Sequence, residues 1–223
     1  NNMSEKETRL QATYDTLHAM PEVGFAEQRT SAWSAEGIEA AGFSVTTGVG
    51  GTGVVAVLKG TEPGPVVALR ADMDALEHVV NGETVRVHSC GHDAHCSMVL
   101  TVAEELAKTG IRRGTLKILF QPAEEKLTGA TRMIEAGAID DVDILLGIHL
   151  RPIQEAKTGQ ATPALYHGSS YIMEATIAGQ TAHGARPHLG INAIDGAAAA
   201  VQAVNAIHLN PVIPFTCKVT KLA

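Results

Sequence analysis

The densest group of potential metal ligands in the sequence is the six-residue segment Cys90–His95, which reads CGHDAH. A cysteine, two histidines and an aspartate packed this closely are typical of a metal site. Cys90 and His92 are two positions apart, so in an extended or looped conformation both side chains can converge on one side. His95 would point elsewhere if a helix begins here. We predict that this segment supplies part of a metal site and that other segments complete it.

Further candidate ligands follow apolar segments elsewhere in the chain. Continuous apolar runs at 65–69, 115–120 and 142–148 are typical of strands buried in a parallel sheet. Acidic or histidine side chains stand just past the ends of these runs: Asp72, Glu124, Glu125 and His149. Ligands of open α/β sheets bind outside the carboxyl ends of the strands. We therefore expect these side chains to meet at one place.

The remaining pattern indicates the elements that position these residues. Apolar periodicity predicts helices at 5–20, 26–41, 93–108 and 129–136, and further strands at 43–47 and 54–58. The spaced glycines of 48–53 match a dinucleotide-binding pattern, but a strand follows them where that motif requires a helix, so we interpret them as a turn. A loop is expected between Asp72 and Cys90. The alternation of strands and helices predicts an α/β fold with a mainly parallel, helix-covered sheet.

The chemistry of the candidate ligands favours a transition metal. Cys90, His92, Glu125 and His149 would offer sulfur, nitrogen and oxygen donors. This set suits zinc and leaves manganese, nickel and cobalt open, whereas magnesium and calcium prefer oxygen alone. Adjacent glutamates diverge in direction, so one can bind metal while the other acts as a general base. A metal lowers the pKa of bound water from about 15.7 toward about 7, and such a water attacks amides.

Two of these candidates also have a purely structural interpretation. Glu124 and Glu125 could form an exposed acidic pair that opens a helix, and His149 could be a satisfied histidine at a strand end. Both interpretations weaken in a chain that also contains the Cys90–His95 segment.

The composition excludes several classes of protein. The 223 residues carry a formal net charge of −7, with a pI near 5.8, and no long basic run that would favour nucleic acid or an anionic membrane. No apolar run approaches the length of a membrane span, and no signal-peptide pattern opens the chain, so we expect a cytoplasmic protein. Three cysteines do not suggest a disulfide framework, and we expect Cys96 and Cys217 to be reduced thiols in the core.

Four motifs resemble one enzyme family. RADMDAL (70–76), CGHDAH (90–95), QPAEE (121–125) and GIH (147–149) occur in this order. Together they resemble the amidohydrolase branch of the aminoacylase-type metallopeptidases, which includes hippuricases and plant auxin-conjugate hydrolases that cleave N-acyl amino acids. The resemblance implies two divalent metal ions with a bridging water, bound by the ligand set above. It also implies that Glu124 is the general base and that Asp72 orients a ligand.

A second module is expected after the catalytic one, giving domains 1–167 and 168–223. Alternating residues predict strands at 171–177 and 214–220 around an alanine-rich helix at 192–209, a small α+β module. The segment 179–187 resembles the family's lid or dimerisation domain. The resemblance implies a homodimer in which His183 polarises the scissile carbonyl of a small-molecule amide, often in the partner's site. The alternative for His183, Arg186 and His188 is a solvated loop.

The sequence departs from the family pattern in one respect. Family members continue beyond this point and supply a further histidine ligand, whereas the last histidine here is His208, within the expected lid helix. We therefore expect either a fragment of a longer protein or the loss of a ligand. Two hypotheses follow: a metal-dependent amidohydrolase, or a catalytically incompetent fragment that acts only as a metal-binding or self-associating module.

Overall fold

The computed structural model describes residues 4–166 and 168–222 as two compact units, Asn1–Gly159 and Gln160–Ala223. The domain boundary predicted between residues 167 and 168 falls at a position outside the described residues.

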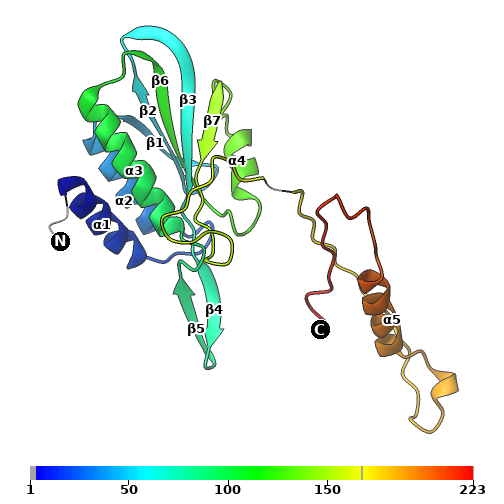
Figure 1. Ribbon diagram of the computed structural model, residues 1–223. Helices are drawn as coiled ribbons and strands as arrows, with labels where there is room; N and C mark the ends of the chain where they lie inside the picture. The colour runs from blue at the N-terminus through cyan, green and yellow to red at the C-terminus, as the bar shows by residue number, and fades with distance from the viewer. Residues whose placement is uncertain (1–3, 167, 223) are drawn as a thin grey trace. The chain divides into compact units, whose positions relative to one another are not determined.

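The first unit is built on one five-stranded sheet (Figure 1). Its strands, in spatial order, are β1 (Ser44–Val49), β2 (Gly53–Lys59), β6 (Arg113–Gln121), β3 (Glu62–Asp72) and β7 (Ile144–Gly147). The pairs β3–β6 and β3–β7 are parallel, while β1–β2 and β2–β6 are antiparallel. The α/β class is thus confirmed, but the sheet is mixed and only its β6–β3–β7 half is parallel. The reason is that the glycine turn at 48–53 joins β1 and β2 as a hairpin, as predicted, and hairpins are antiparallel.

Helices cover both faces of this sheet. On one face lie α1 (Glu5–His18), α2 (Gln28–Ala40) and α3 (His92–Thr109), whereas α4 (Gly129–Glu135) lies on the other (Figure 1). The alternation of side chains along β2 follows this division: Val54 and Ala56 belong to the larger core under α1–α3, and Val55 to the smaller core with Met133 of α4. All four predicted helices are confirmed within a few residues at their ends.

A short hairpin replaces the loop expected between Asp72 and Cys90. Strands β4 (Leu76–Val80) and β5 (Glu83–Val87) pair with each other and not with the main sheet. Asn81 and Gly82 join them, both with positive φ (53° and 82°), as a two-residue turn of this kind requires. The prediction of a loop was wrong because Asn-Gly, a pair that readily adopts positive φ, joins two alternating runs that pair with each other.

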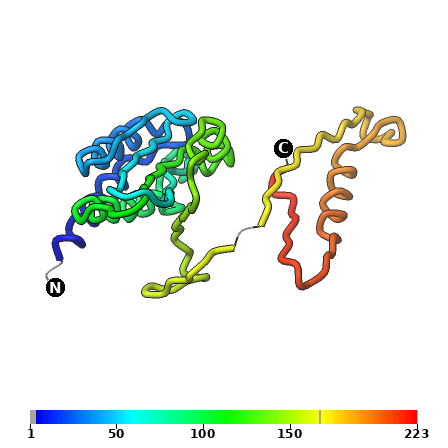
Figure 2. The backbone as a smooth tube through the Cα atoms, turned by 90° about the horizontal axis from the view of Figure 1, so that it is seen from above, coloured from blue at the N-terminus to red at the C-terminus, as the bar shows by residue number. Residues whose placement is uncertain are grey.

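The described part of the second unit contains one α-helix, α5 (Ala193–Asn205), and a 3₁₀ turn, η1 (Pro187–Leu189) (Figure 2). The predicted helix at 192–209 is confirmed in a shorter form, but the strands predicted at 171–177 and 214–220 are not formed. Within the described part of this unit the one β pairing is an isolated bridge between Gln180 and Ile191. An alternating segment becomes a strand only when a neighbour satisfies its backbone N–H and C=O groups, and these two segments have no such neighbour.

Among the described residues, no helix combines the length and apolar character needed to cross a membrane. The cytoplasmic location stays a prediction.

Candidate metal centre

The predicted ligands meet at one edge of the sheet because the parallel strands end there. β3 ends at Asp72, β6 ends at Gln121 just before the glutamate pair, and β7 ends at Gly147 just before His149. The helix α3 begins at His92, at the same edge. Gly91 precedes it with φ +81°, and a Cβ there would lie 2.9 Å from Leu150 Cδ1, so glycine is required where the segment turns into the helix.

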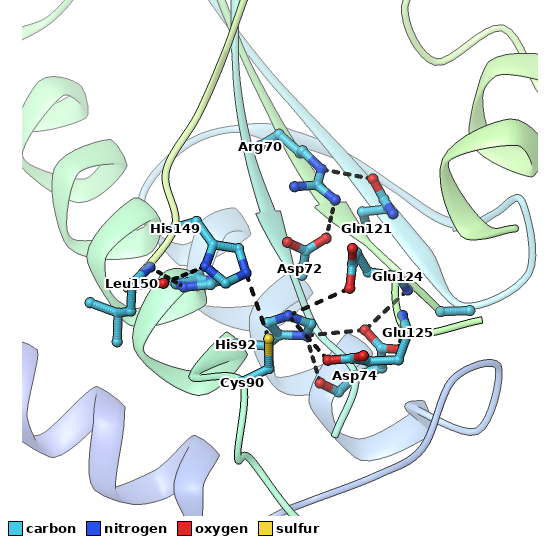
Figure 3. A network of polar contacts seen from close by, with 12 residues as sticks. Arg70, Asp72, Asp74, Cys90, His92, Gln121, Glu124, Glu125, His149 and Leu150 are labelled. Carbon is cyan, nitrogen blue, oxygen red and sulfur yellow. Dashed lines mark hydrogen bonds and ion pairs between the residues drawn. The ribbon is translucent and has the colours of Figure 1, made fainter. Parts of the chain in front are cut away.

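His92 is at the centre of the cluster and is fully buried (Figure 3). Its Nδ1 is 2.8 Å from the backbone oxygen of Asp74 and 3.2 Å from the carboxylate Oδ1 of the same residue. Its Nε2 lies 3.9 Å from a carboxylate oxygen of Glu124 and 3.9 Å from one of Glu125. Burial lowers the pKa of His92, but Asp74 and the other carboxylates outweigh this effect and raise it. The site therefore favours positive charge.

Cys90, which precedes α3, and His149, which follows β7, lie next to each other in the cluster. Cys90 Sγ is 3.7 Å from His149 Nε2, and His149 Nδ1 contacts the backbone oxygen of Leu150 at 2.5 Å, so its Nε2 faces the cluster. Burial, and then the neighbouring Glu125 and other carboxylates, raise the pKa of the Cys90 thiol to about 12. A cation would have to displace this proton to gain a thiolate ligand.

The ligand atoms form two overlapping groups that share His92. One group is Cys90, His92 and Glu125, and the other is Asp72, His92, His95 and His149; within each group the ligand atoms lie within 4.8 Å of one another. Several of these atoms are buried and lack a hydrogen-bond partner: His92 Nε2, Asp72 Oδ2, His95 Nδ1 and Glu125 Oε1. Buried polar atoms are rarely left unpaired, and mixed donors of this kind suit transition metals. The residues therefore fit a metal centre.

The carboxylate in contact with the ring of the predicted ligand His92 is that of Asp74, not that of Asp72. Asp74 holds His92 Nδ1, and its pKa is lowered because hydrogen bonds from His92 and two backbone N–H groups outweigh the effect of burial. Asp72 forms an ion pair with Arg70 through Oδ1, and Arg70 Nε donates to Gln121 Oε1 at 2.7 Å. Burial raises the pKa of Asp72, which Arg70 only partly offsets. The spacing Asp72-Met73-Asp74 gave no means of choosing between the two aspartates.

His95 points into the cluster, which contradicts the expectation that it would point elsewhere. On α3 it lies one turn from His92, and residues three apart share a helix face. Its ring centroid is 4.4 Å from that of His149, and its Nε2 accepts the Leu150 N–H at 2.9 Å. Burial and the neighbouring histidines lower its pKa to about 3, so it is neutral. Asp93 is the residue that turns away, toward His18 Nδ1 at 2.6 Å.

The two glutamates lie in a loop that a buried carboxylate holds in place. The backbone N–H groups of Glu124 and Glu125 donate to Asp74 Oδ1 and Oδ2 at 3.1 and 3.0 Å. Both side chains face His92 and are only partly exposed, at 33% and 23%. The interpretation as an exposed acidic pair opening a helix is therefore wrong, since α4 begins only at Gly129.

His183 belongs to the second unit and is exposed, with its Nδ1 accepting the Ala185 N–H at 3.1 Å. Arg186 and His188 lie in the same exposed loop. The predicted role of His183 at the metal centre stays a prediction.

An α/β sheet that gathers sulfur, nitrogen and oxygen donors at the carboxyl ends of its strands is typical of metal-dependent hydrolases. The particular family is evident from the sequence: residues 68–219 match peptidase family M20/M25/M40, and the chain belongs to that family. The resemblance drawn from the four motifs is confirmed.

The similar proteins include named amidohydrolases. The N-acyl-L-amino acid amidohydrolase of Geobacillus stearothermophilus is 35% identical over 98% of this chain and 62% of its own length. The IAA-amino acid hydrolase ILR1-like 2 of Arabidopsis thaliana is 34% identical over 93% of this chain and 49% of its own. The chain thus spans about half to three fifths of the length of the relatives it matches.

A solved structure supports the fold and the type of centre. The Bacillus subtilis YxeP protein, a dinuclear metal-binding peptidase of the M20 family, superposes with a TM-score of 0.59 at 35% identity. The match covers 65% of this chain and 43% of that one.

Proposed function

We propose that this protein is a metal-dependent amidohydrolase that cleaves the amide bond of N-acyl amino acids or small peptide-like substrates. One observation carries the proposal: buried, unpartnered ligand atoms from β3, α3 and the loop after β6 converge beside Cys90 and His149. The names of the similar amidohydrolases supply the substrate class.

Cys90, His92, Glu125 and His149 would hold two divalent ions, zinc or else manganese, nickel or cobalt. Bound there, the ions would supply Lewis-acid polarisation of the amide carbonyl and a water of lowered pKa. Asp74 fixes His92 so that Nε2, and not Nδ1, faces the ions.

Glu124 is the proposed general base. Its carboxylate lies 3.9 Å from His92 Nε2, at the edge of the ligand group, while its backbone is held by Asp74. From this position Glu124 accepts a proton from the attacking water and returns it to the leaving amine. Glu125 has its own carboxylate beside His92 Nε2, so it can bind metal while Glu124 acts as the base.

The second unit is proposed to act as a lid that mediates a homodimer, with His183 polarising the scissile carbonyl. The support for this role is the resemblance of segment 179–187 together with the exposure of His183. Sedimentation that shows a monomer at assay concentration would count against catalysis by His183 across an interface.

The test is hydrolysis of N-acetyl and N-benzoyl amino acids by protein loaded with manganese, zinc or cobalt. We expect turnover that falls by at least about 100-fold in Glu124→Gln, because removing a general base costs roughly 10²–10⁴ in rate. The metal content should be unchanged. The matched control is Glu135→Gln on the exposed face of α4, which should retain full activity. Metal binding without hydrolysis by the unmodified protein would instead support a metal-binding module.

A further inference from the structure

The connection between α1 and α2 contacts both loops that carry the acidic residues of the centre. We propose that Glu27, at the end of this connection, is a positioning residue that sets the place of Glu124 and Glu125 by holding the backbone of Ala123. The proposal rests on the proposed function.

Glu27 is fully buried, and both of its carboxylate oxygens are hydrogen-bonded. Oε1 accepts the N–H of Ala123 at 2.8 Å, and Oε2 accepts the hydroxyl of Thr52 at 2.6 Å. Glu27 also occupies the N-cap position of α2, but its side chain makes no capping hydrogen bond to that helix. The start of α2 is capped instead by Glu22, whose carboxylate accepts the N–H of Thr30 at 2.9 Å. One oxygen of Glu27 is therefore available to hold the distant loop that carries Ala123.

The loop that Glu27 holds has an unfavourable backbone conformation. Ala123 has φ +48° and Leu127 has φ +55°, a region that residues with a Cβ rarely adopt. Such a conformation is unfavourable and persists only where the surroundings impose it. Here three consecutive N–H groups, from Ala123 to Glu125, are fixed by two buried carboxylates, Glu27 and Asp74. Glu27 and Asp74 together therefore determine where the base and the ligand point.

The rest of the connection is fitted to the same two loops. A Cβ at Gly24 would lie 2.9 Å from both Cα and Cβ of Ala123 and 3.3 Å from Asp74 Oδ2. Val23 forms a parallel bridge with Ala75, and the Ala75 N–H donates to the backbone oxygen of Glu22 at 2.8 Å. The connection is thus packed against the loop that contains Asp74 and the loop that contains Glu124.

The test compares two substitutions of Glu27 in the full chain. Glu27→Met keeps the length of the side chain and removes the acceptor, so we expect kcat to fall about 100-fold, because displacement of a catalytic group by about 1 Å costs that much. KM should change less than about threefold. Glu27→Gln keeps an acceptor for Ala123 and should restore most of kcat. The affinity for metal, measured by titration without substrate, should fall in Glu27→Met and recover in Glu27→Gln.

The matched control is Glu22→Met, on the same connection. The Glu22 carboxylate accepts from Thr30 N and Oγ1, both at 2.9 Å, at the start of α2. This variant loses a partly buried carboxylate acceptor that does not bond to the glutamate loop, so it should keep both kcat and metal affinity. If Glu27→Met fails to fold, Gly24→Ala replaces it, because its added methyl group pushes mainly on Ala123, and less closely on Asp74, while the Glu27 side chain is kept; the same loss is expected.

The proposal would be overturned if Glu27→Met, or its replacement Gly24→Ala, kept the kcat and the metal affinity of the wild type. An equal loss in Glu22→Met would also overturn it, since the effect would then belong to α2 and not to the loop. The metal titration distinguishes failure of this proposal from failure of the proposed function. If the wild-type protein shows no turnover, the difference in metal affinity between wild type and Glu27→Met can still be measured.

Discussion

Among the single residues of the site, Asp74 and not Asp72 contacts both the predicted ligand His92 and the glutamate loop. Asp74 accepts hydrogen bonds from His92 and from the backbone of both glutamates, whereas Asp72 pairs with Arg70. In Asp74→Asn, one carboxylate oxygen becomes an NH2 group, which cannot accept a hydrogen bond from the neighbouring N–H donors. We therefore expect the affinity for metal to fall about 10–100-fold. Asp72→Asn should cost less. Isothermal titration with zinc measures both, and the reverse order would show that Asp72 is the orienting residue.

Cys90 gives the centre a defined dependence on pH. Its pKa is raised to about 12, so at neutral pH the thiol is protonated, and binding as a thiolate releases one proton. Metal affinity should therefore rise with pH, and Cys90→Ala should reduce the slope of log K against pH by about one. Cys217→Ala, in the second unit, is the control. Equal slopes in wild type and Cys90→Ala would mean that the thiol does not coordinate.

At the scale of elements, the approach of α4 to the glutamate loop is tight. A Cβ at Gly129 would lie 1.6 Å from the backbone oxygen of Pro122. Alanine in a helix is otherwise favoured over glycine by up to about 1 kcal/mol. We nevertheless expect Gly129→Ala to destabilise the protein by about 1–3 kcal/mol, as overpacked sites do, and to weaken metal binding. Urea denaturation measures the first effect. Gly168→Ala, with nothing within 4 Å, should be neutral, and a stabilised Gly129→Ala would contradict this geometry.

The elements also show how far the sequence alone could lead. The apolar runs of β3, β6 and β7 identified the edge where Glu124, Glu125 and His149 gather, because strand ends and ligand crevices coincide in such sheets. The expectation for His95 was wrong because the predicted helix begins at residue 93, whereas α3 already includes His92, so that the i, i+3 spacing places both histidines on one helix face. Glu27 gave no signal, since its contact with Ala123 spans 96 positions of chain.

At the scale of the whole molecule, the two units differ in the burial of their residues. The first contains two hydrophobic cores, whereas no described residue from 160 onward is buried. Tyr171 and Met173 are 86% and 89% exposed. The strands predicted at 171–177 and 214–220 therefore failed for a physical reason, because alternation creates a strand only where a core and a partner exist.

This difference predicts the pattern of hydrogen exchange. Amides of β3 and β6 should be strongly protected, whereas those of 171–177 should exchange freely at low protein concentration. If the second unit mediates the proposed homodimer, protection of 171–177 should rise with protein concentration. Strong protection of this segment at every concentration would contradict the absence of a core in the second unit.

The central claim is that Cys90, His92, Glu125 and His149 bind divalent metal. The most direct test is elemental analysis of metal per polypeptide, after incubation with zinc or manganese and dialysis. We expect close to two ions per chain in the wild type and a clear reduction in the double variant Cys90→Ala, His92→Ala. Close to zero in wild-type protein that is folded by circular dichroism would contradict it.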